Sequence, residues 1–294
     1  MKKRLLRWFY LIVWIMALGL LVVESSVVIC KSCFRTCDYT VAIEGITSDT
    51  KVVLISDLHS CEFGKDNERL LRAIAAERPA AIFCVGDMVN ADADDAEVQH
   101  MVDFVARLHQ IAPVYYSLGN TELQNMVDGG ADILRLVRSV GAVALLDDYV
   151  ETEIGGNRVN IGFTMGHYNY TSYQWSTAAD YAMEHSVGAD GTPAIVLMHM
   201  PETLIKDIHD TWTGDLYLCG HTHGGIWRIP GVGGVFAPTQ GFWPEYDRGY
   251  YTFDDGKYQM IITPGFGGHD WIPRIFNMPE ISVIHLTGTT GSQS

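Results

Sequence analysis

Five apolar runs of strand length in this chain each lead into a residue whose side chain can bind a metal ion. The runs are rich in Val, Ile, Leu and aromatic residues, which is typical of strands buried on both faces. They read KVVLISD, AAIFCVGD, VYYSLGN, AIVLMH and LYLCGH, and they end at Asp57, Asp87, Asn120, His199 and His221. Ligands of open α/β sheets bind at the carboxyl ends of the strands. We therefore expect these five side chains to lie close together.

Amphipathic helix patterns lie between the first three runs and after them. Segments 66–78, 94–110 and 131–140 each place apolar residues at the i, i+3, i+4 spacing of one helix face. The first segment is followed by Pro79 and the last by Gly141, both of which favour a helix end. This alternation of strand and helix from residue 51 to about 147 predicts βαβ units and a largely parallel sheet.

The pattern changes after Asp148. Segment 149–167 predicts a hairpin that turns at Gly155-Gly156-Asn157, and segment 248–263 predicts another that turns at Asp254-Asp255-Gly256. The run 281–286 predicts a closing strand. Together with the preceding units, these elements indicate an α/β fold.

The first thirty residues form a separate region. Four basic residues among the first seven precede an uncharged apolar run over 8–23. Continued to Cys30, this stretch reaches the roughly 20 residues that span a bilayer. The positive-inside rule then places the N-terminus in the cytoplasm and the remainder outside. A signal peptide cleaved near 23–25 is the alternative, and we favour an uncleaved single-pass anchor in the cell membrane.

Composition and cysteine usage bear on the number of domains, the class of partner and the roles of the cysteines. A length of 294 residues with 48% hydrophobic residues allows one large domain with a full core. The formal net charge of −15 argues against nucleic acid as a partner, because phosphate backbones are bound by basic patches. Cys30, Cys33 and Cys37 are compatible with a zinc site or with a Cys33–Cys37 disulfide, and neither interpretation is favoured.

The donor types indicate a metal centre. His59 and His223 follow Asp57 and His221 by two residues, which brings the set of candidate ligands to seven. Oxygen and imidazole donors without thiolates suit Mn²⁺, Fe²⁺ or Zn²⁺ better than Ca²⁺. Seven donors are too many for one tetrahedral site but suit two divalent ions that share a carboxylate. The sequence therefore predicts a metalloenzyme.

The candidate ligands lie in sequence blocks that resemble a known family. SDLHS, VGDMVN, LGNTE, MH and CGHTHGG, which lie within residues 56–225, are similar to the ordered blocks of the calcineurin-like metallophosphoesterases. GGVFAPTQGFWPEYDRGYY and FNMPEISVIHL resemble the membrane-anchored bacterial branch of that superfamily. The resemblance implies a four-layer α/β/β/α sandwich of two mixed sheets, with one N-terminal transmembrane helix and metals at the strand ends.

The resemblance also implies a role for each candidate ligand. Two metal ions would be held, one by Asp57, His59 and His223 and the other by Asn120, His199 and His221. Asp87 would bridge them, and a bridging hydroxide would attack phosphorus.

One block departs from the family pattern. The family's third block usually reads Gly-Asn-His followed by an acidic residue, whereas this chain has Thr121 in place of the His. That His normally steadies the transition state and protonates the leaving oxygen, and a threonine cannot act as such an acid. We consider His167 as a replacement acid, although a solvated loop histidine is the simpler interpretation. Loss of the acid favours pyrophosphates and activated diesters, whose leaving groups need less protonation.

A second departure concerns substrate binding. The chain has Thr263-Pro264-Gly265 where the branch often has Ser-Arg-Gly, so an anion-binding arginine is missing. Arg228, Arg248 and Arg274 are the possible replacements, and each is also compatible with an ordinary surface charge.

These observations predict a membrane-anchored, dinuclear-metal phosphoesterase that acts on phosphate esters, with lipid-linked or envelope substrates. We expect residues 1–30 to be a basic cytoplasmic stub and anchor, 31–37 a linker, 38–287 the catalytic domain and 288–294 a flexible tail. Two alternatives stay open. One is a metal-binding pseudo-enzyme that serves as a sensor or scaffold, and the other is an enzyme acting on soluble nucleotides after signal-peptide cleavage. Neither oligomeric state nor metal identity follows from the sequence.

Overall fold

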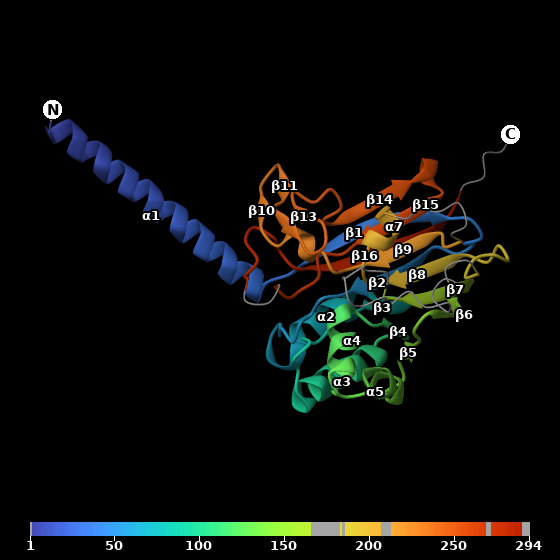
Figure 1. The fold of residues 1–294 in the computed structure, drawn as a ribbon. Coiled ribbons are helices and arrows are strands. Elements are labelled where there is room, and N and C mark those ends of the chain that lie inside the picture. The colour runs from blue at the N-terminus through green and yellow to red at the C-terminus, as the bar shows by residue number, and fades with distance from the viewer. Residues whose placement is uncertain (1, 166–182, 184–185, 207–212, 269–271, 290–294) are drawn as a thin grey trace.

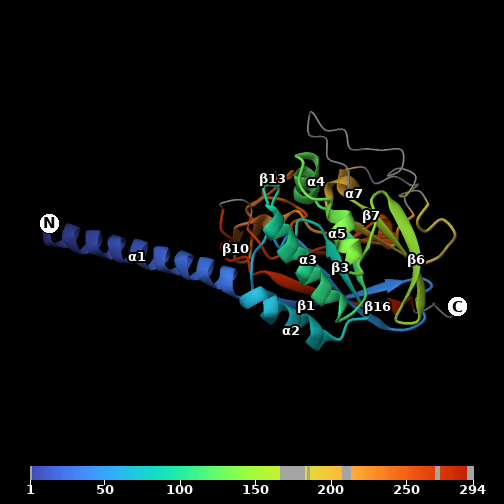
Figure 2. The same ribbon diagram turned by 90° about the horizontal axis from the view of Figure 1, so that it is seen from below.

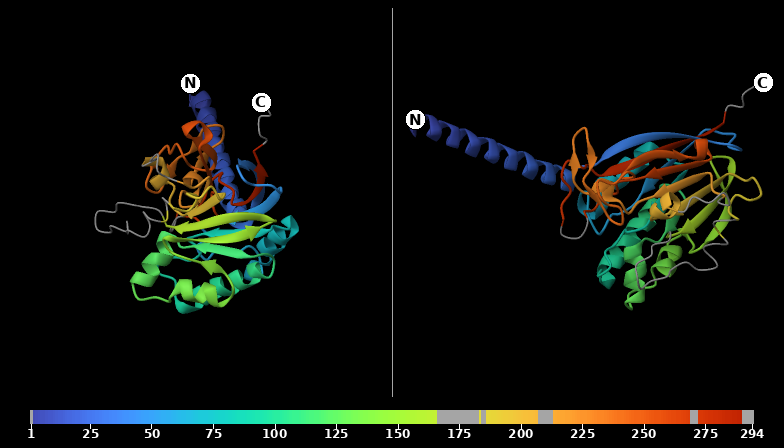
Figure 3. Two further views of the ribbon diagram at one scale, coloured as in Figure 1. Left: turned by 90° about the vertical axis from the view of Figure 1, so that its right-hand side faces the viewer. Right: turned by 45° about the horizontal axis from the view of Figure 1, so that its top comes forward.

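Two six-stranded mixed sheets face each other across a shared apolar core (Figure 1). The structure is a computed structural model, and it describes residues 2–165, 183, 186–206, 213–268 and 272–289. The layers are seen from the end in the left view of Figure 3. The expected arrangement of two mixed sheets is therefore confirmed.

The first sheet contains the strands that precede the first three candidate ligands. Its order is β1-β16-β2-β3-β4-β5. The bounds are β1 (Arg35–Ile43), β2 (Thr50–Ile55), β3 (Ala81–Val85), β4 (Val114–Ser117), β5 (Val143–Ala144) and β16 (Glu280–Gly288). Strands β2 to β5 are parallel, whereas β16 runs antiparallel to β2. The parallel part follows from the βαβ pattern read in the sequence.

The second sheet contains the strands that precede His199 and His221. Its order is β14-β15-β9-β8-β7-β6. The bounds are β6 (Asp148–Ile154), β7 (Asn157–Thr164), β8 (Ala194–Met198), β9 (Leu216–Cys219), β14 (Gly249–Phe253) and β15 (Tyr258–Ile262). The pairs β6–β7 and β14–β15 are the two predicted hairpins, and both are antiparallel. The inner four strands, β15, β9, β8 and β7, are parallel to one another.

Alternate side chains of the central strands pack on opposite sides. In β3, Phe83 and Val85 join the core between the sheets, whereas Ile82 and Cys84 face the helices. This is the two-sided burial that the uninterrupted apolar runs predicted. The helices that cover the first sheet are α2 (Glu68–Glu77), α3 (Asp95–His109) and α5 (Ile133–Ser139), as Figure 2 shows from below.

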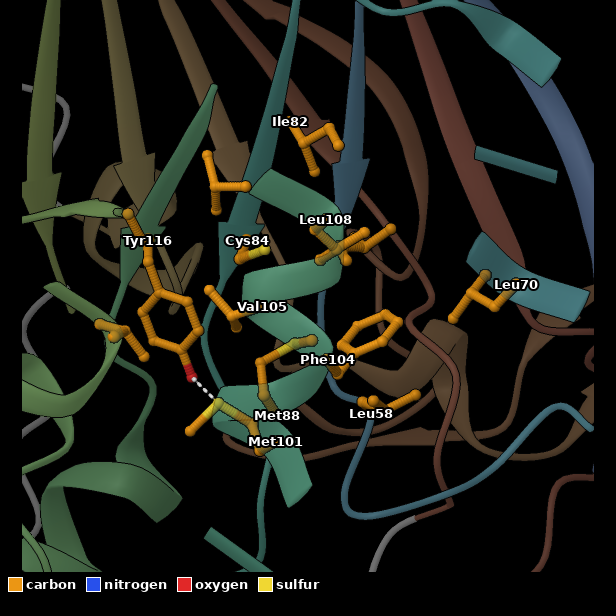
Figure 4. Close-up of a cluster of buried hydrophobic side chains, with 14 of the residues drawn as sticks. Leu58, Leu70, Ile82, Cys84, Met88, Met101, Phe104, Val105, Leu108 and Tyr116 are labelled. Atoms are coloured by element: carbon orange, nitrogen blue, oxygen red, sulfur yellow. Dashed lines mark hydrogen bonds between the residues drawn. The ribbon is translucent and has the colours of Figure 1, made fainter. Parts of the chain in front are cut away.

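Helix α3 supplies much of that helical layer. Its residues Met101, Val105 and Leu108 pack over Cys84 and Tyr116 of the sheet (Figure 4). An Asp94–Glu97 capping box begins the helix, as the acidic residues before it suggest. The outer face of the second sheet is covered, within the part of the chain described, by the short helix α7 (Glu202–Lys206) together with loops.

The N-terminal helix α1 (Lys2–Ser32) projects from the domain (Figure 1). Among the described helices it is the one that is long and apolar enough to cross a membrane, and a signal sequence has the same properties. Its last turns contact the domain: Ser26 Oγ accepts a hydrogen bond from the backbone N–H of Phe276 at 2.6 Å, and Cys30 is buried.

Strand β1 differs from the sequence-based prediction. It begins at Arg35, inside the stretch 31–37 that we expected to be a linker, so only two residues separate it from α1. The strand lies at a sheet edge and pairs with β16 along its length. Its first six residues are not buried, so no apolar run marks its start. Cys30, Cys33 and Cys37 are all present as free cysteines.

Candidate metal centre

The carboxyl ends of five parallel strands meet where the two sheets adjoin. Strands β2, β3 and β4 come from one sheet, and β8 and β9 come from the other. Their loops assemble two groups of side chains, and in each group the donor atoms lie within 4.8 Å of one another. The groups are Asp57, His59 and His223, and Asp87, His199 and His221.

Asp87 lies between the two groups. Its Oδ2 is 3.2 Å from Nε2 of His199 and 3.6 Å from Nε2 of His59. His59 belongs to the first group, so the Asp87 carboxylate contacts members of both. This is the position that a carboxylate shared by two cations must occupy.

Unusual backbone conformations direct these side chains inward. Five of the candidate ligands have positive φ angles: Asp57 at 50°, His59 at 46°, Asp87 at 54°, His221 at 67° and His223 at 49°. Residues other than glycine adopt this left-handed region infrequently, and such residues cluster at functional sites. The chain therefore turns sharply at the strand ends, and strain is concentrated where the donors converge.

Glycines allow the loops to approach one another. A Cβ atom on Gly86 would lie 2.3 Å from the backbone N of Gly119, and one on Gly119 would lie 2.2 Å from Oδ1 of Asp87. The backbones of the VGDMVN and LGNTE blocks are thus in direct contact. A larger residue at either position would separate Asp87 from the block that contains Asn120.

Hydrogen bonds fix which nitrogen of two histidines faces the centre. His199 Nδ1 lies 2.7 Å from the carbonyl oxygen of Val85, and His59 Nδ1 lies 3.0 Å from Oδ1 of Asn90. Both partners are acceptors, so each Nδ1 donates and each Nε2 is left for a ligand. Metal-binding histidines are commonly held in this way.

The third block lies beside Asp87. Asn120 begins α4 (Asn120–Val127), and its Oδ1 is buried without a hydrogen-bond partner among the described residues. Thr121 donates from its backbone N to Asp87 Oδ1 at 2.9 Å, and its hydroxyl lies 2.8 Å from the same oxygen and 2.6 Å from the carbonyl of Val89. Thr121 therefore supports Asp87. His167 lies outside the described residues.

Glu122 is a structural residue of this site that sequence reasoning did not single out. Its buried carboxylate accepts hydrogen bonds from the backbone N of Asp87, Met88 and Gly119, and from the Tyr116 hydroxyl. One side chain thus joins the second and third blocks. The sequence feature that could have identified Glu122 is its position directly after Asn120-Thr121.

The residues present fit divalent cations. Carboxylate and imidazole donors converge without a thiolate, and the Nε2 of His59 is buried with no hydrogen-bond partner in the described part of the chain. Burial of such polar atoms is costly unless something binds them.

Comparisons with known proteins agree with this geometry. The model of the family "Calcineurin-like phosphoesterase" matches residues 50–225, a range that contains both groups of donors.

The chain belongs to this family.

Several relatives share most of the chain. Phosphodiesterase YaeI of Escherichia coli is 26% identical over 239 residues, which cover 80% of this chain and 82% of the relative. An uncharacterized metallophosphoesterase of Campylobacter jejuni, Cj0846, is 26% identical over 259 residues, but the match spans only 62% of that protein's length and 84% of this chain. TT1561 of Thermus thermophilus has a TM-score of 0.46 at 11% identity and covers 74% of this chain and 91% of its own. Family membership and the clustered donors imply divalent metal ions.

The guanidinium groups of the three arginines considered for substrate binding differ in their hydrogen bonds and ion pairs. Arg274 is buried, and its guanidinium donates to the carbonyl oxygens of Gly267, His223 and Pro264, so it braces the ligand loops. Arg228 forms an ion pair with Asp247 at 2.6 Å. Both arginines thus have structural contacts, and the anion-binding role suggested by the sequence stays a prediction for them. Within the described part of the chain, the Arg248 side chain makes one long hydrogen bond, 3.4 Å to Asn277 Oδ1, and Arg248 stays a candidate.

Electrostatic coupling joins the acidic and basic members of the centre. Burial alone would lower the pKa of His199, but the nearby Asp87 carboxylate outweighs it and raises that pKa to about 10. Burial would raise the pKa of Asp87, yet His199 and His59 lower it overall. Burial raises the pKa of Asp57, and the Asp87 charge adds to this rise. The metal-free centre therefore holds a proton on His199 at neutral pH.

Metal binding should release that proton. An ion can bind His199 Nε2 only after deprotonation, so we expect affinity to increase as pH rises from 7 towards 10, by about tenfold per unit for one proton. In the metal-free protein the raised pKa has the opposite effect, because its stabilising contribution is complete below pH 6.5 and is lost as pH rises through 10.

Titration calorimetry with Mn²⁺ in two buffers of different ionisation enthalpy measures the released proton. His285→Gln, far from the centre on β16, is the matched control and should leave proton release unchanged. Affinity that is independent of pH between 7 and 9 would contradict this coupling.

Proposed function

We propose that this protein is a membrane-anchored, dinuclear-metal phosphoesterase that prefers phosphodiesters or pyrophosphates. The observation that carries the proposal is the position of Asp87 between two groups of carboxylate and imidazole donors. The similarity to phosphodiesterase YaeI of Escherichia coli supports the diester preference. The combination of imidazole and carboxylate donors favours Mn²⁺, Fe²⁺ or Zn²⁺ over Ca²⁺.

The donors divide naturally into two ligand sets. Asp57, His59 and His223 would hold one ion, and His199, His221 and Asn120 the other, with Asp87 shared. The divalent ions, when bound, supply Lewis-acid activation of the phosphoryl group and of water. The chain itself orients the imidazoles through Val85 and Asn90, and it fixes the shared carboxylate through Thr121.

The environment of Thr121 supports a preference for good leaving groups. Its hydroxyl lies within hydrogen-bond distance of Asp87 and Val89, and an aliphatic hydroxyl is too weakly acidic to protonate an alkoxide. A departing phosphate or aryloxide requires little protonation, so pyrophosphates and activated diesters should react best.

The substrate pool is inferred from α1. If this helix spans the cell membrane with its basic end in the cytoplasm, the centre lies outside, close to the bilayer. A cavity of about 450 Å³ lies where α1 meets the domain, lined among others by Cys30, Lys31, Cys61 and Arg274. Its place between the helix and the ligand loops supports lipid-linked or envelope phosphate esters as substrates.

Turnover by the purified full-length chain tests the function. Loaded with Mn²⁺, it should hydrolyse an aryl phosphodiester and a pyrophosphate diester faster than an alkyl diester. Stoichiometric metal binding without turnover of diesters, monoesters or pyrophosphates would overturn the proposal and favour a metal-binding pseudo-enzyme, for which Thr121 is the supporting observation.

A gain-of-function substitution tests the leaving-group argument. Thr121→His should increase hydrolysis of alkyl diesters by up to about 10²-fold, with a smaller increase for aryl diesters, because general acid catalysis matters most for poor leaving groups. Thr121→Val is the control, since it removes the hydroxyl group beside Asp87 without adding an acid, and the backbone N–H of residue 121 still donates to Asp87 Oδ1. Steady-state rates for a series of leaving groups provide the measurement, and an equal increase across the series would refute the argument.

A further inference from the structure

A group of exposed apolar side chains lies beside the point where α1 joins the domain. We call it the apolar rim, and it consists of Trp227, Ile229, Val232, Phe242, Trp243 and Phe276. Val232, Phe242 and Trp243 are 69%, 73% and 60% exposed, which is high for such residues. Two small hairpins carry or adjoin most of the rim: β10 (Arg228–Ile229) with β11 (Gly233–Gly234), and β12 (Phe236–Ala237) with β13 (Gly241–Phe242). Ile229 and Phe242 lie on these strands, whereas Trp227, Val232 and Trp243 lie directly beside them. Figures 1 and 2 show β10 and β13 near the domain end of α1.

Direct contacts connect the rim to α1. Phe276 N donates to Ser26 Oγ of the helix, and the neighbouring Ile275 forms a parallel bridge with Trp227. Val235 N donates to the Trp227 carbonyl at 2.7 Å, and Trp243 N donates to the Val235 carbonyl at 2.8 Å. The backbone segments that carry the rim are therefore linked to one another and to the helix.

The burial pattern of α1 marks where a bilayer would end. Val23, Ser26, Val27 and Cys30 are buried or half-buried, and their spacing puts them on one helix face against the domain. Residues 5–22, which precede them, are exposed throughout. At 1.5 Å per residue this exposed stretch is about 27 Å long, close to the hydrocarbon thickness of a bilayer. The bilayer surface would then lie near Ser26, which is the residue that contacts Phe276.

The rim has the charge distribution of a surface that meets lipid. Residues 229–243 contain no charged side chain. The adjacent Arg228 is paired with Asp247, and the Trp227 indole N–H donates to the Pro273 carbonyl at 3.0 Å. Tryptophan is favoured at the membrane interface, where its ring contacts lipid and its indole N–H finds a hydrogen-bond partner.

We propose that the apolar rim inserts into the interfacial layer of the same bilayer that α1 spans. This inference rests on the proposed anchor and adds a second membrane contact made by the catalytic domain. The rim is tied to the metal centre, because the Ile226 N–H and the Arg274 guanidinium both donate to the His223 carbonyl. Two contacts with the bilayer thus fix the domain's orientation and hold the candidate ligands at headgroup level.

Lipid quenching of a fluorescent amino acid at position 232 tests the contact. The full-length chain is reconstituted into phosphatidylcholine vesicles with ordinary or brominated acyl chains. The matched control carries the same residue at position 146, where an exposed leucine lies between β5 and β6, away from α1 (Figure 1). Brominated lipid should abolish most emission at 232 and leave emission at 146 unchanged. Phe242→Asp combined with Trp243→Asp should remove the quenching at 232 while the protein still floats with vesicles.

Three outcomes would overturn the proposal. Quenching at 232 by aqueous iodide but not by brominated lipid means that the rim lies in water. Shielding from both quenchers means that a second copy of the chain covers it. A full-length chain that does not float with vesicles refutes the anchor and the rim contact together. Catalysis is not needed for this measurement, so failure of the proposed activity would leave its result unaffected.

Discussion

Asp87→Asn should reduce phosphodiester hydrolysis by about 10³-fold or more, since it weakens both halves of the centre at once. Asp87 Oδ2 lies within 3.2 Å of His199 and 3.6 Å of His59, and Oδ1 accepts from Thr121. An amide in place of the carboxylate loses the negative charge and offers only one acceptor oxygen.

Metal content and activity should be measured on the same preparation. Elemental analysis is expected to find fewer bound ions in Asp87→Asn than in the natural chain, and kcat should fall rather than KM rise. Asp49→Asn, an identical chemical change at an exposed position, should alter neither quantity. A variant that keeps full metal content and at least a tenth of the activity would refute the shared-carboxylate assignment.

Glu122→Ala should destabilise the fold by at least about 3 kcal/mol, because each buried donor left without an acceptor costs 1–3 kcal/mol. Four donors lose their acceptor in this variant, three of them backbone N–H groups. Glu122→Gln should also be harmful, since each carboxylate oxygen accepts two bonds and the amide nitrogen of glutamine can accept none. The position therefore requires a carboxylate.

Urea unfolding of the metal-free variants measures this effect. Glu153→Ala, on the exposed face of β6, is the control and should lie within about 0.5 kcal/mol of the natural chain. Metal affinity of Glu122→Gln should decrease 10- to 100-fold, as is usual when support of the ligands is disturbed. Wild-type stability in Glu122→Ala would show that water replaces the carboxylate at no cost.

The positions of the strand ends were predictable from the sequence. Buried strands were predictable because their apolar residues are continuous, and donors such as Asp57 and His199 stood out against that background. Which sheet each strand joins was not predictable from the pattern, because β2 and β8 are both short, largely apolar runs that differ in the strands beside them. The family resemblance, not periodicity, indicated two sheets.

The supporting residues were harder to find because their roles depend on tertiary contacts. Glu122 looks like an ordinary residue of an amphipathic helix until the Asp87 and Gly119 loops are placed around it. Arg274 was considered for its charge, whereas its function in the fold is to donate to three carbonyl oxygens. Burial lowers the pKa of this guanidinium to about 10, so it stays charged in that position at neutral pH.

The left-handed backbone at the strand ends sets a trade-off between robustness and catalysis. Five of the candidate ligands adopt this conformation, and together they cost on the order of 5–10 kcal/mol, at roughly 1–2 kcal/mol each. That total is comparable to the entire net stability of a typical domain. Glycine at any of these positions would relax the loop and remove a donor in the same step. Selection for higher stability of the metal-free chain and selection for a full set of metal ligands therefore act in opposite directions on the same five residues.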